Sequence, residues 1–436
     1  MKMKTFKGGQ HIDGFKHLSR EMAIKTLPLP SQVIIPLSQH TGAVCEPVVK
    51  KGDMVKTGTL IGTSDKLISS RIHASLSGVI KDILEYNHPI LGQAQAVIID
   101  SDGNDTLDSA IVKRTKIELL SKEQLLEIIK NAGIVGLGGA AFPAQVKLNP
   151  LKPVDTLLIN GVECEPYLTC DYRLMLEHTN SILKGIVLMQ KIIGVETVII
   201  GIEEDKLEAI KLLRNKCVEK KYNIEIVCLK AKYPQGAEKQ LIKAILDREV
   251  PSGKLPFDVG VIVSNVGTAF AVFEAVYNAK PLYERVVTVT GKCVKQPSNL
   301  KVRIGTRFKE LLDFCQGFTQ TPGKIIMGGP MMGMSQYTDD LPVIKGTSGI
   351  LVLSQKEVQE FSQGADQSCI RCGRCVNICP VGMLPYALSL CVEMNKLDKA
   401  AQYNPFDCIE CGACTYVCPA KRQILSGIRL IKAVTR

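Results

Sequence analysis

The sequence predicts a multidomain protein of the α/β plus β class. Residues 33–83 contain short apolar strands separated by turn residues, and from about residue 120 helical and strand patterns alternate. Two cysteine strings close to the C-terminus indicate a further, metal-binding domain. At 436 residues the chain is long enough for three or four domains, each with its own hydrophobic core.

The N-terminal β-rich region reads V-K-K-G-D-M-V at residues 49–55 and S-G-V at 77–79. This pattern resembles the lipoyl-like barrel-sandwich, a small all-β domain. Lipoyl domains carry a prosthetic group on a lysine at a hairpin tip, and Lys66 lies near that place. Because the flanking Ser64 and Leu67 match only in part, we expect Lys66 to be an unmodified surface residue.

From about residue 120 the pattern predicts a Rossmann-like α/β domain. Ser121 and Gln124 form a capping box, which predicts the start of a helix that continues to Asn131. Short, continuously apolar segments follow, with helical stretches between them, at residues 156–159, 197–200, 224–227 and 259–263. Such segments are typical of a parallel sheet that is covered on both faces.

A second β-rich region follows the α/β domain. We expect a strand at 285–291, a helix near 307–314 and a methionine- and glycine-rich segment at 327–334. Residues 341–349 contain Gly, Ser and Pro, which predicts a linker. The expected domains cover residues 1–105, 106–280, 281–340 and 341–436.

Two near-identical cysteine strings both read C-x2-C-x2-C-x3-C-P. The first contains Cys369, Cys372, Cys375 and Cys379, and the second contains Cys408, Cys411, Cys414 and Cys418. This spacing holds [4Fe–4S] clusters, and the fourth thiolate of each string binds the neighbouring cluster. We therefore predict a helical double-cluster ferredoxin domain with crossed ligation, in which one cluster takes Cys369, Cys372, Cys375 and Cys418, and the other takes Cys408, Cys411, Cys414 and Cys379. Zinc knuckles are the alternative, but zinc sites usually show two separated short pairs.

Composition and charge argue against several classes of protein. The formal net charge is +11, and each oxidised cluster with its thiolates adds about −2. The chain has no Trp and no Lys/Arg-rich block, so nucleic-acid binding is poorly supported. We expect no signal peptide and no membrane span, because the most apolar stretch, 257–276, is interrupted by polar residues. Iron–sulfur chemistry and unpaired thiols indicate a reducing compartment.

A glycine-rich segment with Gly136, Gly138 and Gly139 precedes the first strand predicted for the α/β domain. A helix lies before it and Pro143 after it, so it does not fit the strand–glycine–helix rule of the dinucleotide fingerprint. Its glycines would still let the backbone approach a phosphate or a flat ring closely. Polar clusters follow the predicted strands, at 160–165, 203–204, 233–238 and 265–268. Because the carboxyl ends of parallel strands meet at one edge, we expect a ligand crevice there.

These segments resemble the NADH-binding flavoprotein subunit of respiratory complex I. Residues 136–147 are similar to its G-x-G-G-A-G-F-P…K, 160–173 to N-A-D-E-x-E-P…D-R, 233–241 to Y-x-x-G-E-E-T-x-L, and 265–268 to N-x-x-T. The resemblance implies a non-covalently bound FMN lined by Gly136, Gly138, Gly139, Lys147, Asn160, Tyr233, Gly236, Glu238, Asn265 and Thr268. It also implies that Glu163 and Glu165 lie on the nicotinamide side of the flavin. The chain departs from that family at Leu137, Val162 and Ala237, where the family has Arg, Asp and Glu.

The whole chain resembles the RnfC family of Rnf-complex proteins, beginning near Phe6-Lys-Gly-Gly-Gln-His11 and ending with the two cysteine strings. The resemblance implies a β-grasp (soluble ligand-binding) domain between the flavin fold and the clusters. Rnf complexes are membrane-bound ferredoxin:NAD oxidoreductases that translocate Na⁺ or H⁺. The resemblance also implies peripheral attachment at the cytoplasmic face of the cell membrane. The partners it implies are integral-membrane subunits, an iron–sulfur subunit and, indirectly, ferredoxin.

The expected task is to move electrons between NAD(H) and the clusters. A hydride carries two electrons together, whereas a cluster accepts one at a time, so a flavin is needed between them. Two alternatives stay open, namely an iron–sulfur relay with a vestigial flavin site and a chiefly structural module that docks partners through its β domains. In the tail, Ile424, Ile428 and Ile431 share one helical face, which would either pack on the cluster domain or contact lipid.

Overall fold

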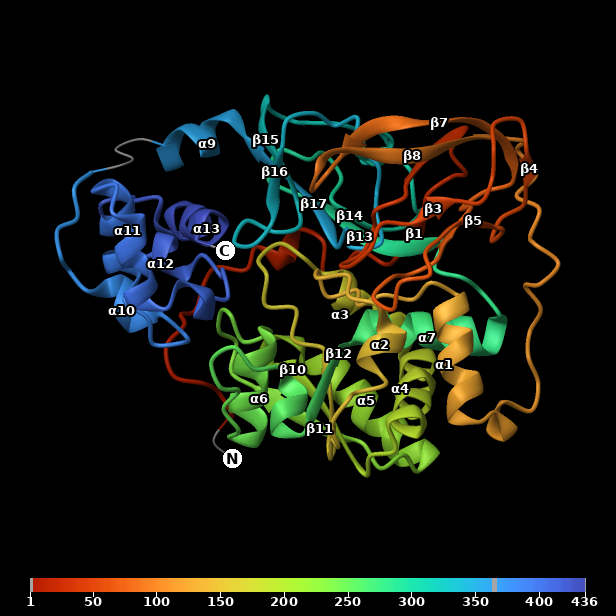
Figure 1. Ribbon diagram of the computed structural model, residues 1–436, viewed down its shortest axis with the longest axis horizontal. Coiled ribbons are helices and arrows are strands. Elements are labelled where there is room, and N and C mark those ends of the chain that lie inside the picture. Colours follow the sequence, from red (N-terminus) through yellow and green to blue (C-terminus); the bar gives the residue numbers. More distant parts are fainter. Residues whose placement is uncertain (1–2, 363–366, 436) are drawn as a thin grey trace.

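The computed structural model describes residues 3–362 and 367–435. Figure 1 shows a cluster domain at one end of the molecule, a barrel domain at the other, an α/β domain below and a mixed sheet above it. Short 3-10 helices lie at η1 (Lys16–Leu18), η2 (Ile117–Leu119), η3 (Glu204–Lys206), η4 (Pro256–Val259), η5 (Leu397–Tyr403) and η6 (Pro405–Asp407).

The barrel domain consists of two small antiparallel sheets that enclose one core. The first sheet has the order β2 (Gln32–Pro36), β8 (Gly92–Ser101), β7 (Gly78–His88) and β4 (Met54–Val55). The second has the order β3 (Glu46–Pro47), β5 (Leu60–Thr63) and β6 (Ile72–His73). Val33, Ile35 and Ile61 are fully buried between the sheets. Lys66 lies exposed in the loop between β5 and β6.

The α/β domain contains a parallel sheet with the order β11 (Glu225–Leu229), β10 (Thr197–Glu203), β9 (Thr156–Asn160) and β12 (Val261–Asn265). Its helices are α1 (Lys122–Asn131), α2 (Ala144–Lys147), α3 (Cys170–Glu177), α4 (Thr179–Ile193), α5 (Leu207–Lys220), α6 (Glu238–Leu246) and α7 (Val266–Asn278). Both the parallel sheet and the helices between its strands were predicted from the sequence.

Helices cover both faces of the parallel sheet because successive strand residues are apolar on both sides. Leu157 and Ile159 of β9 face the core that contains α4 and α7, whereas Leu158 faces the core that contains α6. The predicted capping box is present, since Ser121 Oγ accepts a hydrogen bond from the backbone N–H of Gln124. The apolar pattern and the cap therefore act as the sequence predicted.

The mixed sheet has the order β1 (Lys25–Thr26), β14 (Ser298–Arg303), β13 (Glu284–Thr290), β17 (Gly349–Ser354), β15 (Pro322–Met327) and β16 (Met334–Gln336). Helices α8 (Phe308–Phe314) and α9 (Gln355–Ser362) accompany it. The expected linker at 341–349 is wrong, because β17 pairs with both β13 and β15 inside this sheet. Leu341, Val343 and Ile344 are at most 1% exposed, so the segment before β17 belongs to the core. We place the start of the cluster domain after α9.

The cluster domain contains α10 (Arg374–Ile378), α11 (Pro385–Glu393), α12 (Ala413–Tyr416) and α13 (Ile424–Val434). The apolar stripe of α13 is internal, since Ile424, Ile428 and Ile431 are at most 2% exposed and share a core with Cys375 and Cys414. The stripe therefore packs on the cluster domain, and the alternative of direct lipid contact is wrong for these three side chains.

Candidate functional site

The cysteines predicted to hold the first cluster lie around one cavity of about 250 Å³, whose lining includes Cys369, Cys372, Cys375 and Cys418. Cys372 is exposed, so this cavity reaches the surface of the cluster domain. Cys418 comes from the second string and the other three from the first. The two strings are therefore interleaved in the manner that crossed ligation requires.

Among the other predicted ligands, Cys411 and Cys414 are buried, and Cys379 and Cys408 are partly exposed. Burial and, to a smaller extent, the nearby Cys379 raise the pKa of Cys408, Cys411 and Cys414, so the four thiols lie near one another. Burial raises the pKa of Cys411 to about 11 and that of Cys414 to about 12. Such thiols ionise when a metal replaces the proton. Two sets of sulfur donors in apolar surroundings fit the chemistry of [4Fe–4S] clusters.

The glycine-rich loop lies beside the N-terminus of α7. The backbone N–H of Leu137 donates to Thr268 Oγ1 over 2.9 Å, which ties the loop to the first turn of the helix. Gly138 faces Asn265, and a Cβ added to Gly138 would lie 3.4 Å from the Asn265 Cβ. Gly139 has a φ of +114°, and a Cβ added to it would meet no atom within 4 Å. The outer surface of the loop is thus open, as a flavin- or phosphate-binding loop requires.

Two other domains support this loop from behind. In the barrel domain, Thr41 Oγ1 donates to the carbonyl of Ala140 over 2.7 Å, and the Thr41 N–H donates to the carbonyl of Ala141 over 3.2 Å. In the segment before β17, a Cβ added to Gly346 would lie 3.5 Å from the carbonyl oxygen of Gly139. The position of the loop therefore depends on the assembly of the whole chain.

Several predicted residues meet at the carboxyl ends of β9 and β11. Asn160 Nδ2 donates to the carbonyl of Gly236 over 2.8 Å. Lys147 and Glu238 form an ion pair with 2.5 Å between Nζ and Oε1, and each side chain is about one-third exposed. The structure thus brings Lys147, Asn160, Gly236 and Glu238 to one edge of the sheet, where the sequence predicted a crevice.

Glu163 is engaged by the start of α3. Its carboxylate accepts hydrogen bonds from the N–H groups of Asp171 (2.7 Å) and Tyr172 (3.3 Å). Asp171 in turn accepts from Asn265 Nδ2 over 2.6 Å. Burial raises the pKa of Glu163 to about 7, and the charge of Lys16 opposes that rise. The carboxylate therefore links the β9 loop to α3 and, through Asp171, to the start of α7.

Glu165 is covered by the loop between β15 and β16. Its Oε1 accepts from the N–H groups of Met331 (2.7 Å) and Met332 (3.0 Å). Burial raises the pKa of Glu165, and these two donors oppose the rise. Both acids that the complex I resemblance places on the nicotinamide side thus accept hydrogen bonds from backbone groups of the chain itself.

The Tyr233 side chain contacts the cluster domain. Its side chain is 2% exposed, and its hydroxyl donates to the backbone carbonyl of Cys411 over 2.6 Å. Ile378, Cys411 and Ala413 pack around it. Tyr233 therefore joins the α/β domain to the loop that carries a predicted cluster ligand.

Sequence reasoning missed two lysines beside these acids, Lys16, which is partly exposed, and Lys206, which is buried. Lys16 Nζ donates to the backbone carbonyls of Glu163 (2.7 Å), Glu165 (3.1 Å) and Leu168 (2.7 Å). Lys206 is 2% exposed and forms ion pairs with Glu203 and Asp205. Lys206 had a local signal in the sequence. It follows the acidic residues at the end of β10, and a buried carboxylate such as Glu203 requires a partner. No local signal exists for Lys16, which lies 147 residues from Glu163.

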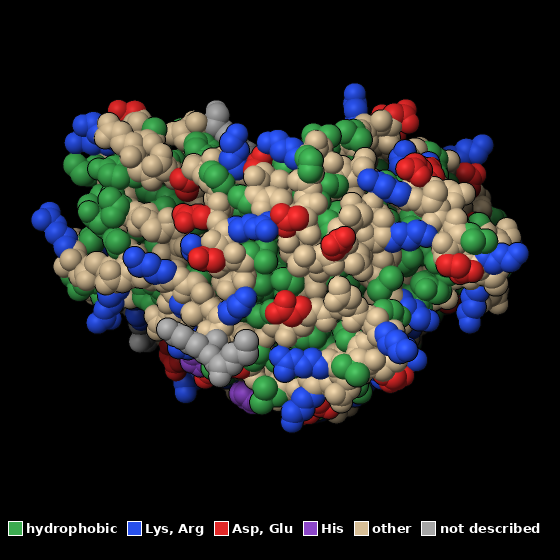
Figure 2. All heavy atoms as spheres, turned by 90° about the horizontal axis from the view of Figure 1, so that it is seen from below, with side chains coloured by type: hydrophobic (Ala, Val, Ile, Leu, Met, Phe, Trp, Pro, Cys, Tyr) green, Lys and Arg blue, Asp and Glu red, His purple; other side chains and the backbone are tan. Residues whose placement is uncertain are grey.

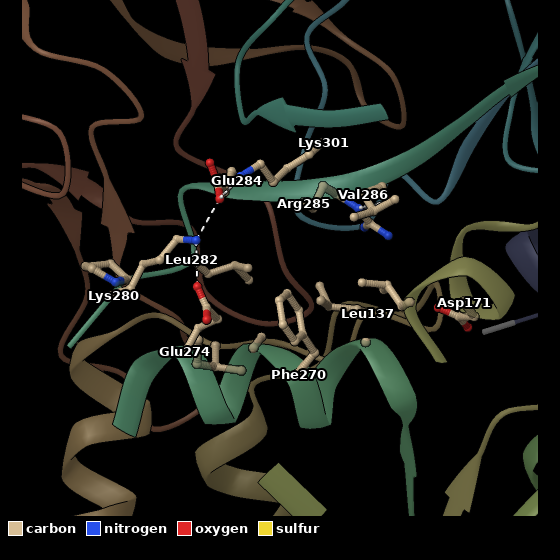
Figure 3. A pocket seen from close by; sticks show the side chains of 15 residues that line it. Leu137, Asp171, Phe270, Glu274, Lys280, Leu282, Glu284, Arg285, Val286 and Lys301 are labelled. Atoms are coloured by element: carbon tan, nitrogen blue, oxygen red, sulfur yellow. Dashed lines mark hydrogen bonds and ion pairs between the residues drawn. The ribbon is translucent and has the colours of Figure 1, made fainter. Parts of the chain in front are cut away.

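A small cavity of about 50 Å³ lies between α7 and β13, beside the glycine loop (Figure 3). Lys280 bridges Glu274 (2.7 Å) and Glu284 (2.6 Å) at one end. Leu137 and Arg285 both line the cavity. Leu137, which stands where the complex I family has Arg, is thus 8% exposed. The guanidinium of Arg285, from the mixed sheet, lies in the same cavity.

Four family models match the chain. They describe an RnfC barrel sandwich hybrid domain at residues 4–104, a Nuo51 FMN-binding domain at 129–274, an SLBB domain at 286–335 and a 4Fe-4S dicluster domain at 368–421. These matches confirm the predicted fold class and the two kinds of cofactor domain.

Curated relatives match over nearly the whole chain. A protein of Clostridium ljungdahlii, named as the C subunit of a proton-translocating ferredoxin:NAD(+) oxidoreductase complex, is 48% identical and covers 100% of this chain and 94% of its own length. A protein of Acetobacterium woodii, named as the C subunit of the Na(+)-translocating complex, is 45% identical and covers 99% and 97%. A protein of Rhodobacter capsulatus, named as the C subunit of an ion-translocating oxidoreductase complex, is 41% identical and covers 91% and 77%.

Among solved structures, a chain of the NAD+-reducing [NiFe]-hydrogenase in the H2-reduced state has a similar fold, with a TM-score of 0.53 and 17% identity. The match covers 73% of this chain and 62% of the hydrogenase chain. Among the helices of residues 3–362 and 367–435, none combines the length and the apolar character needed to cross a membrane.

Proposed function

Because this chain belongs to the RnfC family of ion-translocating ferredoxin:NAD(+) oxidoreductase complexes, we propose that it exchanges hydride with NAD(H) at a bound FMN and passes single electrons through two [4Fe–4S] clusters. The chain is an electron-transfer subunit of a multi-subunit oxidoreductase. FMN, when bound, accepts two electrons together and releases them one at a time, which reconciles hydride chemistry with one-electron clusters.

The residues that would hold FMN are those that meet around the open side of the glycine loop. Gly138 and Gly139 would let the backbone approach the flavin, and the N-terminus of α7 at Thr268 would attract its phosphate. Lys147 would lie at the same edge of the sheet, with its charge paired to Glu238. The remaining members of the proposed site are Gly136, Asn160, Gly236, Glu238 and Asn265.

The observation that best supports this order of electron transfer is the hydrogen bond between Tyr233 and Cys411. It supports a sequence of carriers in which the flavin exchanges electrons with the inner cluster, which is the one bound by Cys379, Cys408, Cys411 and Cys414. The cluster bound by Cys369, Cys372, Cys375 and Cys418 would come next, because its cavity reaches the surface. Electrons would then pass to or from partner proteins through the outer cluster.

The surface beside the outer cluster supports docking of an acidic redox partner. Ile370 is 65% exposed, and Arg371 and Arg374 next to it are exposed. Figure 2 shows hydrophobic and basic side chains gathered at the end of the molecule that the cluster domain occupies in Figure 1. An apolar centre with basic residues around it suits an acidic iron–sulfur protein.

We also propose that the protein is held at the cytoplasmic face of the cell membrane through integral-membrane partner proteins. The apolar stripe of α13 is buried in the cluster domain, so it offers no lipid contact. Attachment would then depend on protein contacts. High salt or mild detergent should release this protein from membranes before any integral component of the complex. A fully soluble protein in cells that make the whole complex would contradict the proposal.

An anaerobic titration of the purified holoprotein with NADH tests the function most directly. We expect bleaching of the flavin band together with EPR signals from two reduced clusters. An iron–sulfur relay without nicotinamide chemistry would show clusters but no extractable FMN. A structural module would show no bleaching by NADH, although dithionite would still reduce the clusters.

A further inference from the structure

The N-terminal strap, defined here as residues 4–18, runs between the cluster domain and the α/β domain (Figure 1, red). Lys4 pairs with Leu229 at the end of β11, and Gln10 pairs with Tyr233 through hydrogen bonds in both directions. This segment lies outside the core of the barrel domain. Its sequence, which contains the Gly8-Gly9 pair, has no role in the electron-transfer chemistry described so far.

Gly8 of the strap lies against the predicted cluster ligand Cys379, and Gly9 lies between Ile378, the residue before that ligand, and Tyr233. The N–H of Gly9 donates to the carbonyl of Ile378 over 2.7 Å. Gly8 has a φ of +83°, and a Cβ added to it would lie 2.7 Å from the carbonyl oxygen of Cys379. Gly9 has a φ of +64°, and its Cβ would lie 2.5 Å from the carbonyl oxygen of Tyr233. Both positions therefore require glycine, for conformation and for space.

The other end of the strap holds the loop that carries Glu163 and Glu165. The carbonyl of Gly14 accepts from the N–H of Tyr167 over 2.6 Å, and the ring of Phe15 stacks on Tyr167 at 4.8 Å. Lys16, the next residue of the strap, donates hydrogen bonds to backbone carbonyls of the same loop. A single short segment thus contacts a cluster ligand at one end and the β9 loop at the other.

We propose that the strap is a positioning element that fixes the cluster bound through Cys379 relative to the flavin site, with Gly8 and Gly9 as its contact points. The inference rests on the proposed function for the identity of the carriers. Groups that touch a metal ligand orient it, and their loss typically changes activity about 10–100-fold. Displacing the carbonyls of Ile378 and Cys379 should therefore change the cluster and its electron exchange, without changing the glycine loop that would hold the flavin.

The test compares Gly8→Ala and Gly9→Ala with Gly14→Ala as the matched control. Gly14 lies in the same strap and keeps its carbonyl in this variant, and the atoms nearest to its added Cβ belong to the Lys16 side chain, at 3.5 Å or more. Each anaerobic holoprotein is examined for iron content, FMN content, the rate of flavin bleaching by NADH, the rate of cluster reduction and the EPR spectrum. Cys379→Ala identifies which EPR signal belongs to the cluster in question.

We expect Gly8→Ala and Gly9→Ala to keep FMN and normal flavin bleaching, but to slow cluster reduction about 10-fold or more and to shift the EPR signal of the Cys379 cluster alone. Gly14→Ala should match the wild type. Wild-type rates and spectra in both glycine variants would overturn the proposal. If wild-type protein itself shows no flavin bleaching by NADH, the proposed function fails instead, and the EPR shift still tests the strap.

A third variant keeps the test decisive if the alanine variants lose both clusters. Gln10→Pro removes the N–H that donates to the carbonyl of Tyr233 over 3.0 Å and leaves both glycines in place. We expect the same slower cluster reduction with retained iron. Unchanged cluster reduction in Gln10→Pro would overturn the proposal.

Discussion

The hydroxyl of Tyr233 donates a hydrogen bond of 2.6 Å to the backbone carbonyl of Cys411, in a buried contact between the α/β domain and the cluster domain. Tyr233 follows β11, and Cys411 lies in the second cysteine string, 178 residues later. The contact joins the strand edge that carries the proposed flavin site to the loop of the proposed inner cluster. Electron exchange between two carriers depends on their relative placement, and this bond is one of the contacts that set it.

Replacing Tyr233 by Phe keeps the ring and removes only the hydroxyl. The buried carbonyl of Cys411 would lose its donor, which costs about 1–3 kcal/mol. We expect slower reduction of the inner cluster by NADH, measured by stopped-flow absorbance, with iron content unchanged. Tyr86→Phe is the matched control, because it removes a bond of the same length, 2.6 Å to Asp340, from β7 of the barrel domain. Equal rates in the two variants would show that the Tyr233 bond does not matter for transfer.

Crossed ligation predicts an asymmetry between Cys379→Ala and Cys418→Ala. Cys379→Ala should damage the cluster held mainly by the second string, because Cys379 lies with those cysteines. Cys418→Ala should damage the outer cluster, whose cavity it lines. Iron analysis combined with EPR of the reduced protein distinguishes the two losses.

Cys391→Ala serves as the control for these variants, since Cys391 is a buried cysteine of the same domain that lies outside both strings. It should keep both clusters. If Cys379→Ala removes only the cluster built on the first string, the ligands are not crossed.

Features that depend on neighbouring residues were predictable from the sequence. The capping box of Ser121 and Gln124 and the apolar segment of β9 are read from a few adjacent positions. The cysteine strings are equally local, since the first three closely spaced thiolates of each string bind one cluster. The four-region organisation of the fold follows from these signals.

Features that depend on distant segments were not predictable. Nothing near Lys16 indicates that it donates to three carbonyls of a loop about 150 residues away. The segment 341–349 contains the Gly, Ser and Pro of a typical linker, yet Leu341 and Val343 are fully buried beside the mixed sheet. Glycine and proline mark irregular backbone, but they do not tell whether that backbone is exposed.

The open side of the glycine loop predicts a graded response at Gly138. Its added Cβ would make ordinary contact with Asn265, so Gly138→Ala should fold normally and lose part of its FMN affinity. Gly138→Val should lose FMN while its iron content stays near normal, because a branched side chain would occupy the space that the flavin needs. Flavin released on denaturation, compared with iron, measures both. Stoichiometric FMN in Gly138→Val would place the flavin elsewhere.

Glu163 predicts a pH dependence of stability. Burial raises its pKa from 4.5 to about 7, so the folded chain binds the proton more tightly than the unfolded chain. The contribution of Glu163 to stability is therefore present at low pH and is lost as the pH rises from about 4.5 to about 7. Glu163→Gln should remove this loss, which unfolding of the flavin domain between pH 5 and 8 would detect. Glu127→Gln, on the exposed side of α1, is the control. An unchanged pH profile in Glu163→Gln would contradict the prediction.

Arg371 and Arg374 predict electrostatic steering of a redox partner to the outer cluster. Both are exposed and follow Ile370, whose side chain offers an apolar contact. An acidic ferredoxin serves as the probe, and its second-order rate of electron exchange with the reduced holoprotein is measured at several ionic strengths. Arg371→Glu and Arg374→Glu should lower that rate at low salt, and the difference should shrink as salt screens the charges.

The control for these reversals is Lys396→Glu, which changes the net charge equally at an exposed position of the same domain. A general effect of net charge would slow all three variants alike. A local docking surface would slow only the two arginine variants, because steering acts within about a Debye length of the contact. Equal rates for Arg371→Glu, Arg374→Glu and Lys396→Glu would place the docking surface away from the outer cluster.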